Sequence, residues 1–341
     1  MAKLAVITTG GTIASVLKKG YFSVQETNSP VAAMIQHAAD TLGFSIDILS
    51  PVNKNSESMT PENWLDVLLA IREACDSQVD GVVVLHGTDT MQYTLAAAGC
   101  FNWPKRVCFT GAMISPEIKG SDAHINLLAA MSFAVDHSYE RGVYLAFCRH
   151  ADRRSASVFR AHEVKPLSFD ESGFQSVYDE YVASYSEQSG LLANHMAMQE
   201  HFPSLARTVL PNRTDFGASQ QQVAYIKLYP GLDLSTLKKV SEGRLVVVIE
   251  LYHSGTGPAS ADYDDLLSLL EGSNGTTLFV LSSFPSKMLQ HPYTSTKALI
   301  QAGAYVCRDL QPHCVYVLCL LMLALGKSVK DIKKHISSYQ L

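Results

Sequence analysis

Short apolar runs alternate along the chain with longer segments whose apolar positions recur every three or four residues. The short runs, rich in β-branched residues, predict buried strands at 4–8, 45–49, 81–85, 106–110 and 142–148. The longer segments between them predict helices at 31–43, 60–75, 90–100 and 122–136. This alternation is typical of a mostly parallel sheet covered by helices on both faces.

The same alternation returns nearer the C-terminus. It predicts strands at 223–228, 245–251, 277–281 and 304–307, and helices at 234–241, 261–271, 295–302, 313–325 and 328–338. A polar segment containing Pro, Gly, Ser and Gln separates the two regions. We therefore expect an α/β fold with a larger N-terminal catalytic domain at 1–204, an interdomain linker at 205–222 and a smaller C-terminal α/β domain at 223–341.

Composition narrows the function classes. Of 341 residues, 47% are hydrophobic and 17% charged, which excludes a disordered chain. The 27 Lys and Arg against 32 Asp and Glu give a net charge of −5, and no basic run exceeds two residues, so a general nucleic-acid binder is excluded. We expect a small-molecule partner.

The seven cysteines are odd in number and scattered through apolar stretches, as reduced core thiols are. The apolar run at the N-terminus is too short for a signal peptide, and the longest one, 315–325, is far below the ~20 residues that span a bilayer. The histidines are dispersed. We therefore expect a cytoplasmic protein that contacts no membrane and needs no metal or cofactor.

Three loops that follow predicted strands carry the candidate chemistry, because ligands of parallel sheets bind beyond the carboxyl ends of the strands. They are rich in glycine and hydroxyl groups: Thr8–Ile13, His86–Met91 and Thr110–Met113. The first loop is neither a GxGxxG fingerprint nor a phosphate loop, so nucleotide binding is a poor interpretation.

Each loop allows two interpretations. Thr12 offers a hydroxyl nucleophile that Tyr21 would help to deprotonate, whereas a Gly-Gly turn and a half-buried tyrosine are ordinary structure. Asp89 beside Thr88 would hold a substrate ammonium, or would cap the helix that begins near residue 90. Convergence of two such loops on one sheet edge favours the functional interpretation.

These motifs carry a resemblance to a known family. Thr9-Gly10-Gly11-Thr12-Ile13 and His86-Gly87-Thr88-Asp89-Thr90-Met91 resemble the two signature motifs of the bacterial-type L-asparaginases, in particular the cytoplasmic type I branch. Further matches are Met59–Trp64, Thr110–Met113, Ser121–Leu127 and Leu251–Gly257. The resemblance covers most of residues 1–136 clearly.

The resemblance implies a two-domain enzyme that hydrolyses asparagine to aspartate and ammonia without a cofactor. It implies a homo-oligomer, a dimer or a dimer of dimers, whose partner subunit closes the site. The implied catalytic residues are the nucleophile Thr12, the loop tyrosine Tyr21, the second threonine Thr88 and the carboxylate Asp89 that holds the α-amino group. The implied substrate-binding residues are Ser56 and Glu57 beside the α-carboxylate, Ala112 at the leaving amide, and Gly11 and Gly87 at the oxyanion, with the amides of Gly11 and of Gly87 or Thr88 as donors.

One departure stands out. The family has a lysine about nine residues before a Phe after the fifth strand, and counting back from Phe169 gives Arg160. An arginine there would still pair with Asp89 but would not relay protons. Another register brings Ser157 to this position, and Lys165 lies five residues from Arg160.

Three hypotheses follow. The first is a type I-like asparaginase. The second is a related amidohydrolase acting on glutamine, a β-aspartyl compound or a specialised amide, motivated by the altered lysine position and by Ile114, where the family often has a polar residue. The third is a catalytically impaired homologue that binds an amino acid. A role like that of the asparaginase-like subunit of tRNA amidotransferases is less favoured, because those chains carry an N-terminal extension.

Overall fold

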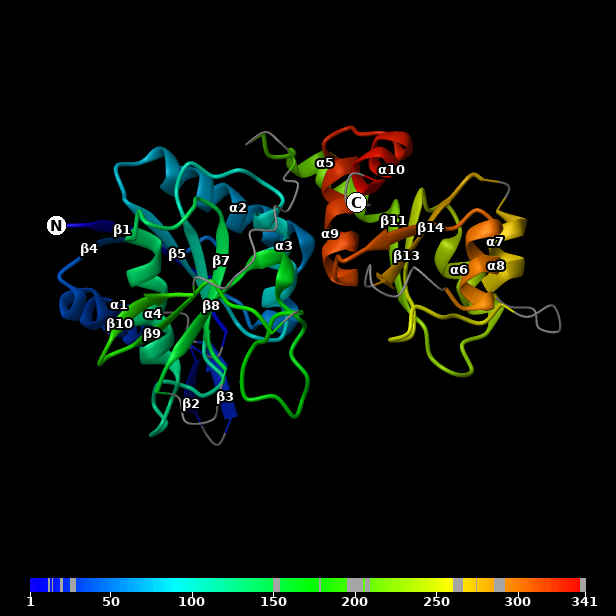
Figure 1. The fold of residues 1–341 in the computed structure, drawn as a ribbon. Coiled ribbons are helices and arrows are strands. Elements are labelled where there is room, and N and C mark those ends of the chain that lie inside the picture. The colour runs from blue at the N-terminus through cyan, green and yellow to red at the C-terminus, as the bar shows by residue number, and fades with distance from the viewer. Residues whose placement is uncertain are drawn as a thin grey trace. The chain divides into compact units, whose positions relative to one another are not determined.

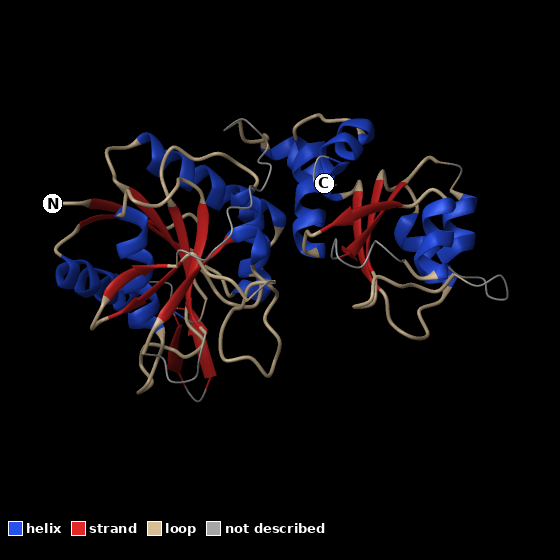
Figure 2. Cartoon of the chain, viewed as in Figure 1, coloured by secondary structure: helices blue, strands red, loops and turns tan. Residues whose placement is uncertain are grey.

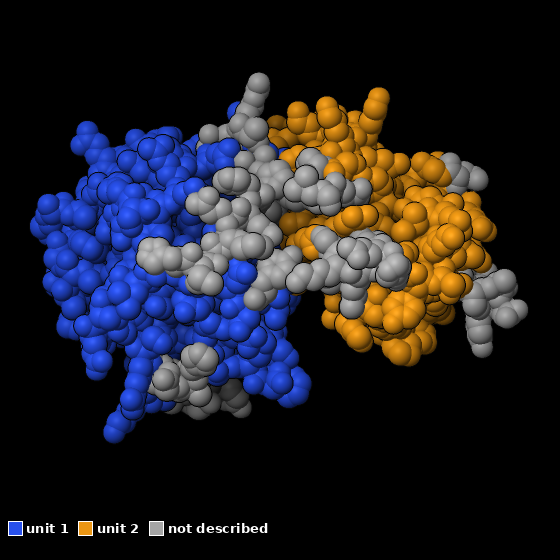
Figure 3. Space-filling view, viewed as in Figure 1, with its two compact units in different colours: residues 1–210 blue, residues 211–341 orange. Residues whose placement is uncertain are grey.

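The chain forms two compact units, Met1–Leu210 and Pro211–Leu341 (Figure 3). The computed structural model describes residues 1–11, 13, 15–18, 21–24, 29–149, 154–177, 179–194, 205, 209–259, 266–273, 275–284 and 292–337. Each unit has its own sheet and its own hydrophobic core (Figure 2).

The first unit is built on an eight-stranded sheet of order β10-β9-β8-β7-β6-β5-β1-β4 (Figure 1). Its parallel strands are β4 (Ser45–Leu49), β1 (Lys3–Thr8), β5 (Gly81–Leu85), β6 (Val107–Thr110) and β7 (Val143–Cys148). Three strands extend it in antiparallel pairing: β8 (Ala156–Arg160), β9 (Ala183–Ser186) and β10 (Gly190–Ala193). A separate hairpin joins β2 (Ser15–Lys18) to β3 (Tyr21–Val24).

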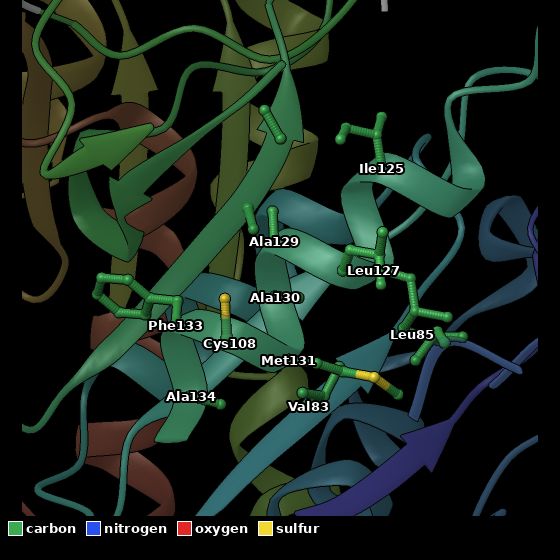
Figure 4. Close-up of a cluster of buried hydrophobic side chains, with 14 of the residues drawn as sticks. Val83, Leu85, Cys108, Ile125, Leu127, Ala129, Ala130, Met131, Phe133 and Ala134 are labelled. Atoms are coloured by element: carbon green, nitrogen blue, oxygen red, sulfur yellow. The ribbon is translucent and has the colours of Figure 1, made fainter. Parts of the chain in front are cut away.

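Helices cover both faces of this sheet. On one face α1 (Ser29–Leu42) and α4 (Ala123–Val135) pack on the strands, and α4 residues such as Leu127 and Met131 meet Val83 and Leu85 of β5 (Figure 4). On the other face lie α2 (Pro61–Asp76) and α3 (Met91–Gly99). Buried on both sides, the central strands are continuous apolar runs, which is why their positions could be predicted.

The second unit repeats this plan with four parallel strands in the order β11-β12-β13-β14. They are β11 (Val223–Lys227), β12 (Val246–Glu250), β13 (Leu278–Phe284) and β14 (Tyr305–Arg308). One face packs on α6 (Leu234–Ser241), α7 (Leu266–Gly272) and α8 (Thr294–Gln301). The apolar helix α9 (Pro312–Ala324) contacts the sheet together with α5 (Arg213–Gln220), and α10 (Val329–Ser337) packs on α9 and β14.

The predicted α/β fold with its mostly parallel larger sheet is confirmed. The pattern did not predict β8, β9, β10 or the β2–β3 hairpin, whose short strands carry few consecutive apolar residues. The segment predicted as linker contains helix α5, which packs on α9. Among the described residues, no helix is long and apolar enough to cross a membrane.

Candidate active site

The carboxyl ends of β1, β5, β6 and β7 meet at one edge of the larger sheet, as parallel pairing requires. Backbone hydrogen bonds join the loop after β1 to its neighbours. Thr9 N–H donates to the Leu85 carbonyl at 3.1 Å, and Gly10 forms a parallel bridge with Lys54. The predicted loops therefore do converge at this edge.

Gly11 lies against Gly87 so closely that no side chain fits between them. A Cβ placed on Gly11 would be 2.3 Å from the Gly87 Cα, and the Gly11 φ of +78° is a left-handed conformation that favours glycine. The Gly11 N–H donates to the Lys54 carbonyl at 3.1 Å. The expectation that this amide serves as an oxyanion donor is therefore wrong for the geometry seen here, because its hydrogen is already bonded.

Ser56 and Asp89 come together across the edge. Ser56 lies in the short helix η2 (Ser56–Ser58) and is buried; its Oγ donates to the Asp89 carboxylate at 3.2 Å and accepts from the Asp89 N–H at 3.2 Å. Thr90 Oγ1 anchors the same turn by donating to the Ser56 carbonyl at 2.7 Å. The Asp89 carboxylate thus bonds to Ser56 rather than capping α3, so the capping interpretation is not what the structure shows.

Asp89 is exposed, and no cation pairs with it among the residues that the structure describes. Glu57, which was predicted beside Ser56 at the α-carboxylate, is also exposed. This end of the site is therefore negatively charged and open to solvent. It is chemically suited to a ligand that carries an ammonium group.

His86 holds the peptide group between Gly87 and Thr88 in place. It is fully buried, its Nδ1 lies 2.8 Å from the Gly87 carbonyl and its Nε2 lies 2.9 Å from Thr94 Oγ1. Because a carbonyl only accepts, Nδ1 carries the hydrogen and Nε2 accepts from Thr94. Burial lowers the pKa of His86 to about 4, so the ring stays neutral near pH 7.

This contact orients the Thr88 amide. In a trans peptide the carbonyl and the following N–H point in opposite directions, so a Gly87 carbonyl directed at His86 turns the Thr88 N–H away from it. Within the described part of the chain, neither the Thr88 N–H nor the Gly87 N–H has a hydrogen-bond acceptor. These two amides are the ones that remain suited to an oxyanion.

Ala112 belongs to the adjoining loop after β6. The Ala112 side chain is buried, and Gly111 before it lies so close to the His86 carbonyl that a Cβ there would be 2.5 Å from that oxygen. The loops that contain Ala112 and Thr88 are therefore in direct contact.

Arg160 is not at this edge, and its predicted pairing with Asp89 is wrong. It ends β8, which runs antiparallel to β7, and it lies opposite Tyr144 rather than near the end of β7. Ala161, the residue after Arg160, packs on Gly99, the last residue of α3. Asp89 precedes the first turn of the same helix, and the helix is about 12 Å long. The Arg160 guanidinium donates instead to Glu163 Oε1 at 3.2 Å.

Ser157 is the alternative that does lie near the edge. It is buried and pairs with Phe147, one residue before β7 ends. Lys165 follows the short helix η3 (Ala161–Glu163), at the same end of the fold as Arg160. Counting back from Phe169 did not find the residue at the sheet edge, because the antiparallel strand β8 was not predicted. Phe169 itself is fully exposed.

Two candidate residues are incompletely described. Thr12 lies outside the described residues, and of Tyr21 the structure describes the backbone, which lies in β3 of the hairpin after the Gly10–Gly11 turn. No cluster of three or more metal-binding side chains occurs among the residues described.

Sequence reasoning missed three contributors to this edge: the buried His86 with its partner Thr94, and the backbone of Lys54. A histidine that closes an all-apolar strand was the available signal for the first, since burial of such a ring requires partners. Nothing in the sequence marks a backbone contact such as that of Lys54.

Comparison with known proteins identifies the family of this chain. Residues 3–197 match the family model described as "Asparaginase, N-terminal". Two curated relatives are glutamyl-tRNA(Gln) amidotransferase subunits. The one from Methanococcus vannielii is 25% identical over 98% of this chain and 78% of the relative, and the one from Halobacterium salinarum is 28% identical over 94% and 75%.

Two solved structures share the fold. The L-asparaginase from Thermococcus kodakarensis superposes with a TM-score of 0.76 at 24% identity, covering 98% of this chain and 97% of that one. L-asparaginase I from Vibrio cholerae superposes with a TM-score of 0.74 at 20% identity, covering 98% and 96%.

Proposed function

The chain belongs to the asparaginase family, and from this premise we propose that it is an amidohydrolase that converts L-asparagine to L-aspartate and ammonia. The observation that carries the proposal is the junction of Asp89 with Ser56, joined by a hydrogen bond of 3.2 Å, beside the amides of Gly87 and Thr88, which have no acceptor among the described residues. One end of this junction suits an α-ammonium group, and the other suits a developing oxyanion.

In the proposed reaction the Thr12 hydroxyl attacks the side-chain amide carbon, with Tyr21 assisting its deprotonation. The Thr88 N–H stabilises the oxyanion, the C–N bond breaks, and ammonia leaves with the proton that the hydroxyl lost. Water then hydrolyses the acyl ester to give aspartate and restores the hydroxyl. Asp89 and Ser56 hold the amino-acid end of the substrate throughout.

We further propose a cytoplasmic homo-oligomer, a dimer or a dimer of dimers, that needs no cofactor. The relatives named as amidotransferase subunits support a second candidate, a chain that hydrolyses an amide within a larger assembly. Ser157, which pairs with Phe147 near the sheet edge and is one of the residues proposed for the family's lysine position, supports a third, a preference for another small amide.

Ammonia release by the purified chain from millimolar L-asparagine tests the proposal. We expect turnover that Thr12→Ala abolishes and Thr88→Ala reduces at least a hundredfold, because each removes a hydroxyl at the reacting centre. Thr41→Ala is the matched control, since Thr41 is exposed on α1 and bonds only to its own helix. Absence of ammonia would contradict the proposal, and a parallel panel of glutamine and β-aspartyl amides would identify a different substrate.

A further inference from the structure

Two buried polar side chains stand four residues apart at the start of helix α4, whose other buried residues are all apolar. Asp122 is 1% exposed and Asn126 is 0% exposed. Asp122 occupies the N-cap position, yet its carboxylate makes no cap hydrogen bond to its own helix. Buried polar groups of this kind are hydrogen-bonded elsewhere, and their partners indicate what they hold.

Their hydrogen-bond partners lie in the loop that follows β6 and at the last residue of β7. The Asp122 carboxylate accepts from Met113 N–H at 3.0 Å, from Ile114 N–H at 3.1 Å and from Asn126 Nδ2 at 2.9 Å. Asn126 Nδ2 also donates to the Gly111 carbonyl at 3.0 Å, and Asn126 Oδ1 accepts from Cys148 N–H at 2.8 Å. The pair therefore fixes two successive peptide groups, one on each side of Ala112.

Peptide geometry then determines where Ala112 points its own polar groups. Because the Met113 N–H is directed at Asp122, the Ala112 carbonyl of the same trans peptide is directed away from Asp122. No donor bonds to this carbonyl oxygen among the described residues. The same reasoning in the neighbouring loop after β5, through His86, turns the Thr88 N–H away from the His86 ring as a donor that has no acceptor among the described residues.

The two loops touch, since Gly111 lies against the His86 carbonyl and His86 N–H donates to the Thr110 carbonyl at 2.9 Å. Within the described part of the chain, the sheet edge thus offers an N–H and a C=O without hydrogen-bond partners on neighbouring loops, each oriented by buried side chains. A hydrolysed amide needs both, a donor for its oxygen and an acceptor for its –NH2 group.

We propose that Asp122 and Asn126 are positioning residues that aim the Ala112 carbonyl at the leaving –NH2 group of the substrate. The inference rests on the proposed function. It adds a physical reason why this enzyme would hydrolyse an amide in preference to an ester. The leaving nitrogen must turn its lone pair toward the incoming proton before the C–N bond breaks. An acceptor for its N–H bonds enforces that orientation, whereas an ester leaving group has no N–H to be held.

The experiment compares two substrates that differ only in the leaving group, L-asparagine and L-aspartate β-methyl ester. In Asp122→Asn one oxygen acceptor becomes a donor, so the loop loses its anchor. We expect kcat for asparagine to fall 10- to 100-fold with KM within threefold, and kcat for the ester to stay within threefold. Asn126→Asp, which removes the donor to the Gly111 carbonyl, is expected to lower the amide-to-ester ratio in the same direction.

Phe133→Leu is the matched control, because Phe133 is buried at the opposite end of α4 and touches neither loop. It is expected to lower stability and to leave the amide-to-ester ratio unchanged. An unchanged ratio in folded Asp122→Asn and Asn126→Asp would overturn the inference.

A wild-type chain that hydrolyses neither substrate would instead refute the proposed function. The inference is then decided by the crystal structure of Asp122→Asn, in which we expect the Ala112–Met113 peptide to have rotated. A peptide that keeps its orientation without the carboxylate would overturn the positioning role.

Discussion

The two units of this chain share one plan, a parallel sheet between helices, but they use glycine in different ways. At the sheet edge of the first unit, a Cβ on Gly10, Gly11 or Gly111 would lie 2.3 to 2.5 Å from the backbone of another segment. In the second unit, Gly243 and Gly303 also have positive φ angles, yet nothing lies within 4 Å of such a Cβ. The first set permits chain segments to touch, and the second only turns the chain.

The difference shows where the positions of backbone segments relative to one another matter most. Contact between backbones brings the loops after β1, β5 and β6 close enough for their peptide groups to face one substrate. The space around the turns of the second unit tolerates change. Substitution of glycine in the two units should therefore have unequal consequences, and that inequality provides the strongest test.

Gly11→Ala and Gly303→Ala form the matched pair. Both place a side chain on a residue with positive φ, +78° and +98°, which costs about 1–3 kcal/mol in either unit. Only the first also drives a Cβ into the Gly87 backbone. We expect Gly11→Ala to lose at least 10³-fold in kcat/KM and Gly303→Ala to stay within about twofold. Comparable activity of the two variants would show that the close contact is dispensable.

This contrast also separates what the sequence predicts from what it does not. The central strands and the helices around them were predictable, because burial on both faces makes each strand a continuous apolar run. The resemblance assigned Ser56 and Asp89 to the same end of one substrate, but it did not predict the hydrogen bond between them. Short antiparallel strands such as β8, which lies between β7 and β9, give no comparable signal, because packing on neighbouring strands rather than composition decides them.

Arg160 illustrates the consequence. A single unpredicted antiparallel strand reverses the chain direction, and a count along the sequence then places a residue at the wrong end of the sheet. Asp122 and Asn126 show a signal that was present but not used: two polar residues at i and i+4 at the start of a helix that is rich in apolar residues. Such a pair predicts a buried network but not its partners.

Arg160→Gln tests the corrected placement. Glu163 is buried, and loss of its charged partner is expected to destabilise the first unit by about 1–3 kcal/mol. Because Arg160 lies at the far end of α3, kcat and KM for asparagine should stay within twofold. Urea unfolding and ammonia release measure the two quantities, with Arg160→Lys as the variant that keeps the charge. A large rise in KM would place Arg160 at the substrate after all.

Acid should weaken both units through histidines whose pKa is lowered by burial, His86 and His162 in the first unit and His313 in the second. Burial lowers the pKa of His86 from 6.5 to about 4 and that of His313 in α9 from 6.5 to about 3. Below pH 6.5 these histidines take up protons in the unfolded chain but not in the folded chain. Their contribution to the free energy of unfolding is therefore full above pH 6.5 and falls as the pH drops toward 4. The expected slope is about 1.4 kcal/mol per pH unit for each histidine.

Urea titrations between pH 6.5 and 4.5 check this slope. His313→Gln should lower the slope of the second unit's free energy of unfolding against pH by the contribution of one proton. Thr41→Ala, which alters an exposed residue that does not titrate, should leave this slope unchanged. An unchanged slope in His313→Gln would show that His313 takes up its proton equally in the folded and unfolded chains.

The smallest expected effect distinguishes the two buried histidines by function. His86 donates to the Gly87 carbonyl and thereby aims the Thr88 N–H, whereas His313 lies in a unit to which we assign no reacting group. Loss of one neutral hydrogen bond, about 0.5–1.5 kcal/mol, corresponds to roughly a 2- to 12-fold change in rate. We expect His86→Leu to lower kcat within this range at constant KM, and His313→Leu to leave kcat unchanged.

A conservative variant separates orientation from packing. In His86→Asn the amide Nδ2 stands close to the place of the imidazole Nδ1, so the donor to the Gly87 carbonyl is retained while the bond to Thr94 is lost. We expect this variant to recover most of the kcat that His86→Leu loses, even if it is the less stable of the two. Equal losses in both variants would mean that His86 only fills space, and that the Thr88 amide keeps its direction without it.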